Sequence, residues 1–259
     1  MNGTQPGTIM FYEECFGEIG GRFRQILPPW SRLRLMTDGL TLRSFVDLTQ
    51  CLHGAQCRDP NVFAYVGKAL GAWIEGLLSE LGVDAEPLVK GEVHQSAILS
   101  GRVYVAPGAV VEPMAYIQGP CYIGPGAEVR HCAYIRGNVY VGRDAVVGHT
   151  TEVKGSIFWD GAKAGHFAYV GDGVLGRNVN LGAGTKLANL PLRRGLIRLK
   201  HPTSGTLISS GLEKFSAILG DGAQTGCNAV LSPGTLLLPG TAVMPCVHFR
   251  GTLTAGTAR

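Results

Sequence analysis

Aliphatic residues recur at nearly every sixth position between Val93 and Leu187, and a small or β-branched residue follows each of them four places later. The blocks read VHQSAI, LSGRVY, VAPGAV, VEPMAY, IQGPCY, IGPGAE, VRHCAY, IRGNVY, VGRDAV and VGHTTE. The period shortens by one residue twice, at VKGSI and VGDGV, stops at Leu187, and resumes from Leu219 to about Val247. A period of six predicts a mainly β protein, with three short strands per turn of a triangular prism of about seven coils.

Each block divides its residues between the inside and the outside of this prism. The aliphatic residue fills the interior and the small residue lets the chain turn the corner; Cys121 takes the small inward position and is interpreted as core filler. Tyr116, Tyr122, Tyr134 and Tyr140 recur at the last position of their blocks, so we expect them to point outward from flat faces. Three prisms packed about a threefold axis would bury such faces, which predicts a homotrimer with active sites at the interfaces.

Residues 1–88 lack the hexapeptide period and are predicted to form a small helical N-terminal region, whereas residues 89–259 form the repeat domain. Asp59-Pro60 precedes an apolar stripe at helical spacing that ends before Gly82, which predicts a capped amphipathic helix. The stripe consists of Val66, Leu70, Trp73, Leu77 and Leu81. A shorter helix is predicted over Thr41 to Leu52.

The interruption of the repeat, residues 188–216, is predicted to be a loop excursion, because the period resumes in register behind it. Its basic residues are Arg193, Arg194, Arg198, Lys200 and Lys214. Such insertions usually line the functional face of a repeat protein. A solvated basic loop is the alternative interpretation.

Composition narrows the class of protein. The net charge of +4 is mild and no basic run is interleaved with aromatic residues, so we expect no nucleic-acid partner. No stretch reaches 18 uninterrupted apolar residues and the N-terminus lacks a signal-peptide pattern, so we expect no membrane association. Seven cysteines without CxxC spacing favour reduced thiols, which predicts a cytoplasmic protein.

The stretches AYIRG, EVKGS, KAGHFAYVGD, NVNLGAGT and AN carry a resemblance that extends over about Val93 to Val247. Here the chain resembles the acetyltransferase domain of the bifunctional glucosamine-1-phosphate acetyltransferase and N-acetylglucosamine-1-phosphate uridyltransferase family. It resembles still more the archaeal-type sugar-1-phosphate nucleotidyltransferase relatives. The resemblance implies a left-handed parallel β-helix that transfers an acetyl group from acetyl-CoA to the amino group of an amino-sugar 1-phosphate.

The resemblance also implies roles for individual residues. His166 in KAGHFAY falls on the catalytic base, and Asn189 falls beside the reacting amine and acyl group. Arg136 in AYIRG and Lys154 in EVKGS fall on the sugar-phosphate ligands. The two further substrate contacts are Tyr169 and Asn180.

The resemblance implies the residues that bind acetyl-CoA as well. Ala183, Cys227 and Pro245 fall where the family lines its cleft for acetyl-CoA, and no metal is expected for acyl transfer. The family usually carries a lysine a few residues past the asparagine, whereas this chain reads NLPLRRGLIRLK. Arg198 or Arg194 is the substitute there, although arginine presents a fixed fork of donors and not a point charge.

The chemistry follows from the residue types as well. A sugar amine is protonated near neutral pH, so acyl transfer needs a base, and histidine titrates in the right range. Backbone amides of the GAGT turn are candidate donors to the thioester oxyanion. Arg136 and Lys154 take the same position of blocks one coil apart, so they are expected to stack about 4.8 Å apart. Two adjacent cations favour a bound anion, and a phosphate is the natural partner.

Two other classes of protein remain open. His131, His149 and His166 each take the third position of their blocks and should form a column, which is reminiscent of the three zinc-binding histidines of hexapeptide-repeat carbonic anhydrases. A straight column places its ends about 9.6 Å apart, which is too far for one ion. Because the nucleotidyltransferase signature is absent, a non-catalytic or regulatory subunit is the other alternative, and uridyl transfer is not expected. Retention of His166, Tyr169, Asn180 and Asn189 argues against an inactive prism.

Overall fold

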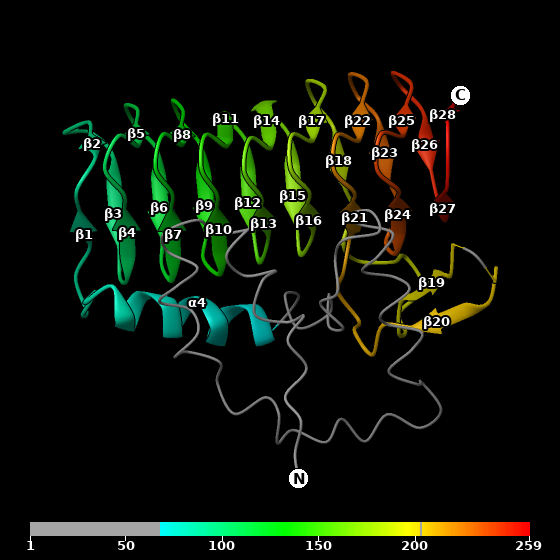
Figure 1. Ribbon diagram of the computed structural model, residues 1–259, viewed down its shortest axis with the longest axis horizontal. Coiled ribbons are helices and arrows are strands. Elements are labelled where there is room, and N and C mark those ends of the chain that lie inside the picture. Colours follow the sequence, from blue (N-terminus) through cyan, green and yellow to red (C-terminus); the bar gives the residue numbers. More distant parts are fainter. Residues whose placement is uncertain (1–67, 203) are drawn as a thin grey trace, which may run out of the picture.

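The computed structural model of the chain describes residues 68–202 and 204–259. In this part of the chain, short strands stack into a prism with one parallel sheet along each of its three faces (Figure 1). The predicted fold class, a parallel β-helix of hexapeptide repeats, is confirmed. The helix predicted over Thr41 to Leu52 and the cap predicted at Asp59-Pro60 lie outside the described residues, so the domain boundary at residue 88 stays a prediction.

The first face, sheet A, has nine strands: β1 (Leu88–Val89), β4 (Val103–Val105), β7 (Cys121–Ile123), β10 (Val139–Val141), β13 (Ile157–Phe158), β16 (Val174–Leu175), β21 (Ala217–Leu219), β24 (Thr235–Leu237) and β27 (Thr252–Leu253). Sheet B has nine: β2 (Glu92–Val93), β5 (Val110–Val111), β8 (Glu128–Val129), β11 (Val146–His149), β14 (Lys163–His166), β17 (Asn180–Leu181), β22 (Gln224–Thr225), β25 (Ala242–Val243) and β28 (Thr257–Ala258). Sheet C has eight: β3 (Ile98–Ser100), β6 (Tyr116–Gln118), β9 (Tyr134–Arg136), β12 (Glu152–Lys154), β15 (Tyr169–Gly171), β18 (Lys186–Leu187), β23 (Val230–Leu231) and β26 (His248–Phe249).

The register explains how the repeat tolerates its irregularities. Tyr122 pairs with Tyr140, which lies three full blocks later in the chain. Tyr140 then pairs with Ile157, and Ile157 with Val174, and each of these steps falls just short of three full blocks. The two single-residue deletions read at VKGSI and VGDGV therefore fall at corners and leave the ladders parallel. Val174 then pairs with Ile218, so the prism resumes directly behind the excursion, as predicted.

The stack is longer than the predicted seven coils, because sheets A and B have nine strands each. It begins at Leu88 and ends at Ala258 rather than running from Val93 to Val247. The last coils are short: Leu236 pairs with Thr252 and Ala242 with Thr257, so both coils contain fewer residues than three full blocks. Such shortened coils break the sixfold period, so the pattern alone did not reveal them.

Small aliphatic residues fill the interior of the prism, where valine, isoleucine, leucine and alanine from all three sheets form one cluster. Cys121 belongs to this cluster with 0% exposure, and burial raises the pKa of its thiol. The prediction that this cysteine is core filler is confirmed.

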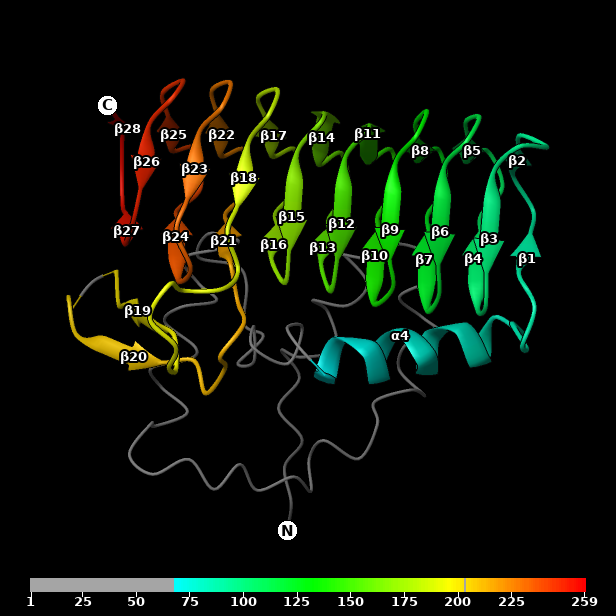
Figure 2. The same ribbon diagram turned by 180° about the vertical axis from the view of Figure 1, so that it is seen from behind.

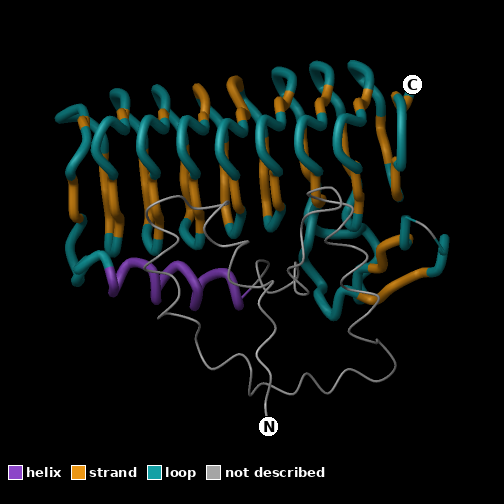
Figure 3. Tube along the Cα trace, viewed as in Figure 1, coloured by secondary structure: helices purple, strands orange, loops and turns teal. Residues whose placement is uncertain are grey.

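Among the described residues, one helix covers part of sheet A. Helix α4 (Lys68–Glu80) runs along the stack of coils (Figure 1 and Figure 3). Leu70, Ile74 and Leu78 are fully buried against the outer side chains of sheet A. Gly82 follows the end of the helix with a φ of 73°, in agreement with the predicted stop signal. No helix among residues 68–202 and 204–259 is long and apolar enough to span a bilayer.

The tyrosines of sheet A correct one sequence-based expectation. Tyr122 and Tyr140 point out of the prism as predicted, but they are only 2% and 6% exposed because α4 covers them. Tyr104, Tyr122 and Tyr140 form a ladder of rings with centroid separations of 5.5 and 4.9 Å, and Trp73 of α4 packs 5.2 Å from Tyr140. These rings are therefore core of the single chain and are not available to a partner.

The excursion packs on the C-terminal strands of sheet A. Its strands β19 (Arg198–Lys200) and β20 (Leu207–Ser209) pair antiparallel, and the hairpin lies beside the C-terminal coils (Figure 2). Ile197, Leu199, Ile208 and Phe215 are buried in the same cluster as the tyrosine ladder. In Figure 1 and Figure 2, α4 and the hairpin lie on the same side of the stack.

Candidate functional site

The corner between sheets B and C carries the predicted column of histidines. His149 pairs in register with His166, and the rings of His131 and His149 stack with centroids 5.7 Å apart and planes 9° apart. All three histidines are exposed. Nδ1 of His131 lies 3.1 Å from the carbonyl oxygen of Pro113, and Nδ1 of His149 lies 3.3 Å from that of His131. Because a carbonyl oxygen only accepts, Nδ1 donates in both rings, which leaves Nε2 as the acceptor in a neutral imidazole.

The three positions expected to line the acetyl-CoA cleft continue this corner beyond His166. The N–H of Gly184 donates to the carbonyl of His166 at 3.0 Å, that of Asn228 to Ala183 at 2.8 Å, and that of Cys246 to Cys227 at 2.8 Å. Thr225 pairs with Val243, so Cys227 and Pro245 occupy the same position of adjacent coils. The structure therefore aligns His166, Ala183, Cys227 and Pro245 along one edge of the prism.

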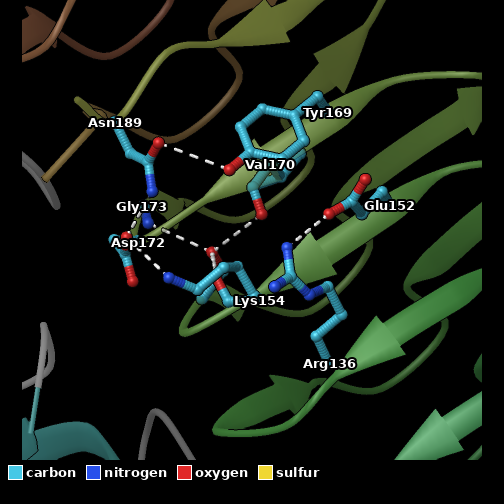
Figure 4. Close-up of polar contacts among 9 residues, drawn as sticks. Arg136, Glu152, Lys154, Tyr169, Val170, Asp172, Gly173 and Asn189 are labelled. Atoms are coloured by element: carbon cyan, nitrogen blue, oxygen red, sulfur yellow. Dashed lines mark hydrogen bonds and ion pairs between the residues drawn. The ribbon is translucent and has the colours of Figure 1, made fainter. Parts of the chain in front are cut away.

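The other edge of sheet C, at the corner with sheet A, carries a second polar cluster (Figure 4). Lys154 Nζ lies 3.2 Å from Oδ2 of Asp172, and Asn189 donates through Nδ2 to the same oxygen at 2.5 Å. The hydroxyl of Tyr169 donates to Oδ1 of Asn189 at 3.3 Å. Three of the predicted site residues thus meet around Asp172, a buried carboxylate that the sequence analysis did not single out.

Arg136 lies one coil from Lys154 at the same position, as their spacing predicted, because Ile135 pairs with Val153. The guanidinium donates to Oε1 of Glu152 at 2.8 Å. This hydrogen bond raises the pKa of Arg136, so the group stays charged. Glu152 pairs with Arg136 and Asp172 with Lys154, so the chain itself supplies a carboxylate to each cation, and a phosphate at this pair stays a prediction.

Local backbone features create room for this cluster. A Cβ on Gly171 would lie 2.6 Å from the Tyr169 hydroxyl oxygen and 2.9 Å from Asn189 Nδ2, so glycine permits the two side chains to meet over it. The two shortened corners contribute as well: Ser156 Oγ donates to the carbonyl of Lys154 at 2.7 Å and accepts from the N–H of Gly173 at 3.1 Å.

The two ends of the excursion close on the same cluster. The N–H of Phe215 donates to the carbonyl of Asn189, and that of Ser216 donates to the carbonyl of Asp172, both at 3.0 Å. The backbone that leaves the prism at Asn189 is therefore bonded to the backbone that returns.

Tyr169 links the two corners across the face of sheet C, because it closely follows His166 in the chain and its hydroxyl reaches Asn189. Burial raises the pKa of this hydroxyl, and the negative charges of Glu152 and Asp172 raise it further. The hydroxyl therefore keeps its proton at neutral pH and acts as a donor to Asn189.

Two predicted residues lie apart from both corners. Asn180 is exposed on sheet B, between Lys163 and Gln224 in register. Arg198 begins β19, and its carbonyl oxygen lies 2.7 Å from where a Cβ of Gly234 would be, over the sheet A end of the excursion. Among the described residues, neither Asn180 nor Arg198 forms a hydrogen bond with His166 or Lys154.

In the GAGT turn, one backbone amide rather than several is available as a donor to an oxyanion. The N–H groups of Gly182, Gly184 and Thr185 donate to Thr225, His166 and Gly182 at 2.8, 3.0 and 3.1 Å. Only the N–H of Ala183 makes no hydrogen bond with a residue that the structure describes. Of the four candidate oxyanion donors, Ala183 is the one that a ligand can use.

Sequence reasoning missed Glu152, Gly171 and Asp172. A signal for Asp172 exists, because it ends the KAGHFAYVGD stretch and directly follows Gly171, the register partner of Lys154 in the next coil. No group of three or more His, Cys, Asp or Glu side chains within residues 68–202 and 204–259 is arranged to hold a metal ion.

The stacked coils and the two polar corners define a hexapeptide-repeat β-helix protein. The chain belongs to the GMPPB C-terminal domain family, whose model matches residues 117–253.

Curated relatives match parts of the same region. A bifunctional sugar-1-phosphate nucleotidylyltransferase/acetyltransferase of Sulfurisphaera tokodaii is 38% identical over 78 residues, which cover 30% of this chain and 19% of that protein. The bifunctional protein GlmU of Methanococcus maripaludis is 36% identical over 148 residues, which cover 56% of this chain and 35% of that protein. The chain therefore spans about a third or less of the length of these relatives.

Solved structures share the type of fold. A hexapeptide transferase family protein from Anaplasma phagocytophilum has a TM-score of 0.32 at 14% identity, with 64% of this chain and 78% of that chain covered. The UDP-N-acetylglucosamine acyltransferase of Francisella novicida has a TM-score of 0.37 at 12% identity, with 62% of each chain covered.

Proposed function

We propose that the chain is an acyl-CoA-dependent N-acetyltransferase that acts on an amino-sugar 1-phosphate, with His166 as the general base. The observation that carries the proposal is the arrangement on sheet C: the exposed imidazole of His166 lies at one edge, and Lys154, Tyr169 and Asn189 meet at the other. The similarity to the bifunctional sugar-1-phosphate nucleotidylyltransferase/acetyltransferase of Sulfurisphaera tokodaii supports this proposal.

In the proposed reaction, acetyl-CoA lies along the corner lined by Ala183, Cys227 and Pro245, with its thioester next to His166. The neutral sugar amine attacks the thioester carbon, the imidazole of His166 takes the proton that the nitrogen loses, and the C–S bond breaks. The proton then passes to the departing sulfur, which leaves as the free thiol of CoA. The unbonded N–H of Ala183 is the donor available to the developing oxyanion.

The charge pattern supports an acceptor that carries both a phosphate and an amine. Arg136 and Lys154 are each paired with a carboxylate, so the cluster as a whole is neutral. A simple anion gains little from a neutral cluster, whereas a zwitterionic ligand can match its cations and its carboxylates at the same time. Asn189, held between Tyr169 and Asp172, is the residue that the resemblance assigns to the reacting amine and acyl group.

Asn180 and Arg198 enter this proposal only through another copy of the chain. They lie on sheet B and on the excursion, away from both corners. In a homotrimer, sheet B of one copy can face sheet C of the next, so that Asn180 and the substrate meet at the interface.

The experiment is an assay of thiol release. The protein is incubated with acetyl-CoA and with glucosamine 1-phosphate, galactosamine 1-phosphate or unphosphorylated glucosamine, and CoA thiol is followed with a chromogenic disulfide. We expect release with at least one amino-sugar 1-phosphate and much slower release with unphosphorylated glucosamine. If no amino sugar supports release, the chain is a non-catalytic subunit; if an activity requires zinc and is abolished by a chelator, the metal-dependent alternative holds.

A further inference from the structure

Asp172 contacts two of the residues that the proposed reaction needs, although no relative's name or motif assigned it a role. We infer that Asp172 is a positioning residue, which presets the ammonium of Lys154 and the amide of Asn189 for the acceptor. The inference rests on the proposed function, because it concerns the same site. It differs from the assignments made from sequence, since Asp172 acts through its neighbours and not on the substrate.

Lys154 and Asn189 share one carboxylate oxygen of Asp172. Oδ2 of Asp172 accepts from Lys154 Nζ at 3.2 Å and from Asn189 Nδ2 at 2.5 Å. One carboxylate oxygen therefore fixes the separation of an ammonium on sheet C and an amide at the start of the excursion. The side chain of Asp172 is only 10% exposed, so little water competes for these bonds.

The second step concerns the direction of the Asn189 amide. Asn189 turns its NH₂ group toward Asp172 and its carbonyl oxygen toward the hydroxyl of Tyr169 (Figure 4). In the flipped orientation the amide oxygen would face the carboxylate, and two acceptors repel each other. The negative charge of Asp172 therefore selects one of two nearly isosteric orientations. This selection decides whether a donor or an acceptor is presented to the ligand.

The third step is the backbone. Asp172 and Asn189 are tied through their carbonyls to the returning end of the excursion, by the N–H groups of Ser216 and Phe215. These bonds do not involve the carboxylate, so a change at the carboxylate leaves them in place. Loss of the Asp172 charge should therefore disturb the orientation of two side chains more than the fold.

The test uses Asp172→Asn in the full chain. The substitution keeps size but replaces one acceptor oxygen by an NH₂ group and removes the charge. We expect kcat for the sugar phosphate to fall about tenfold to a hundredfold, because misplaced groups cost of this order. The KM for acetyl-CoA should change by less than about twofold, because no acetyl-CoA position contacts Asp172.

A second readout does not depend on turnover. In ¹⁵N-labelled protein, the side-chain amide resonances of Asn189, assigned by their loss in Asn189→Ala, should shift in Asp172→Asn and broaden or split as both orientations become populated. If wild type shows no turnover with any amino sugar, the proposed function fails, and this readout still decides whether Asp172 orients Asn189.

Two further variants make the test specific. Asp160→Asn is the matched control, since Asp160 accepts a backbone N–H of Arg143 at 2.9 Å on another corner of the prism, and it should leave kcat and the Asn189 resonances unchanged. Gly171→Ala inserts a Cβ between Tyr169 and Asn189 without a change of charge, and should lower kcat with thermal stability nearly retained. The inference is overturned if Asp172→Asn keeps the wild-type kcat and Asn189 resonances, or if Asp160→Asn loses as much activity.

Discussion

At the scale of single residues, neighbours distinguish three histidines that share one position of the coil. His131 stacks on His149, and Nε2 of His131 lies 3.3 Å from Sγ of Cys132. His166 instead adjoins Ala183, whose N–H makes no hydrogen bond with a described residue. A base and an open oxyanion donor in adjacent coils are what acyl transfer requires, so the chemistry is expected at His166 alone.

Alanine substitutions at the three histidines should affect turnover to different extents. His166→Ala should reduce turnover by about 10²–10⁴, the usual contribution of a general base. Acetyl-CoA affinity should stay nearly constant, because its three lining positions are untouched. His131→Ala and His149→Ala should cost far less. Steady-state kinetics with thiol release measures all three, and an equal loss in all of them, dependent on zinc, would support a metal site instead.

The exposed ion pair of Arg136 and Glu152 leads to a second prediction. If Arg136 binds the phosphate, Arg136→Ala removes charge-assisted hydrogen bonds worth roughly 1.5–3 kcal/mol, which raises the KM for a sugar 1-phosphate by about tenfold or more. Activity on an unphosphorylated amino sugar, where measurable, should barely change. Arg130→Ala is the matched control, since Arg130 forms a similar pair with Glu128 at 2.7 Å on sheet B. Equal KM values for wild type and Arg136→Ala would contradict the assignment.

At the scale of elements, α4 and the excursion both pack on the outer side of sheet A. The guanidinium of Arg102 ties the end of α4 to the prism, with hydrogen bonds to the Val83 carbonyl at 2.7 Å and to Ser79 at 2.9 Å and an ion pair with Glu75. Beneath the helix, the tyrosine ladder buries three phenol groups with Trp73 against them. Both covering elements lie on the face opposite the corner of His166, so they leave that corner accessible.

The buried ladder predicts how stability depends on pH. Burial raises the pKa of Tyr122 to about 12 and that of Tyr140 well above its ordinary value. The unfolded chain ionises its tyrosines near pH 10, whereas the folded chain keeps these phenols neutral. The contribution of these phenols to the free energy of unfolding should therefore be constant below about pH 10 and fall as the pH rises from 10 towards 12, by an amount on the order of 2 kcal/mol for Tyr122. Urea unfolding at several pH values measures the decline.

The control for this effect is Tyr122→Phe, which cannot ionise. Its free energy of unfolding should decline less between pH 10 and 12 than that of wild type. Tyr134→Phe, on the exposed ring of sheet C, should leave the alkaline decline unchanged. A decline of equal size in wild type and Tyr122→Phe would show that the buried ladder is not its cause.

At the scale of the whole molecule, α4 and the excursion pack on sheet A, and neither of them covers sheet C. Ile98, Tyr116 and Tyr134 are register partners on sheet C, and their exposed fractions are 56%, 37% and 41%. An apolar row of this kind favours contact with another copy. The cytoplasmic location expected from the cysteines stays a prediction, as does the trimer.

The assembly prediction is tested by light scattering. We expect a mass three times that of one chain at micromolar concentration. Tyr134→Glu should weaken the assembly by placing a charge in the buried contact, and turnover should fall with it because the sites lie at interfaces. A stable monomer of the wild-type chain that still turns over substrate would contradict both the trimer and the shared site.

Much of the fold and part of the site could be predicted from the sequence, because a β-helix records its geometry locally. Each residue points inward or outward according to its place in a six-residue block, so the core, the shortened corners at VKGSI and VGDGV, and the column of His131, His149 and His166 all follow from counting. The terminal coils did not follow, because each is shorter than three full blocks and this hides their period.

The period of six does not distinguish the three faces of the prism. Tyr122 and Tyr134 hold the same place in their blocks, yet Tyr122 is buried on sheet A and Tyr134 is exposed on sheet C, because α4 packs on one face only. The polar contacts likewise depend on the tertiary structure. Asp172 forms an ion pair with Lys154 of the preceding coil, and it accepts a hydrogen bond from Asn189 at the start of the excursion. The sequence determined inside and outside, since that depends on each residue's own position in the coil. Which outer residues are covered, and which charges neutralise one another, depends on segments far apart in the chain, so only the tertiary structure decided it.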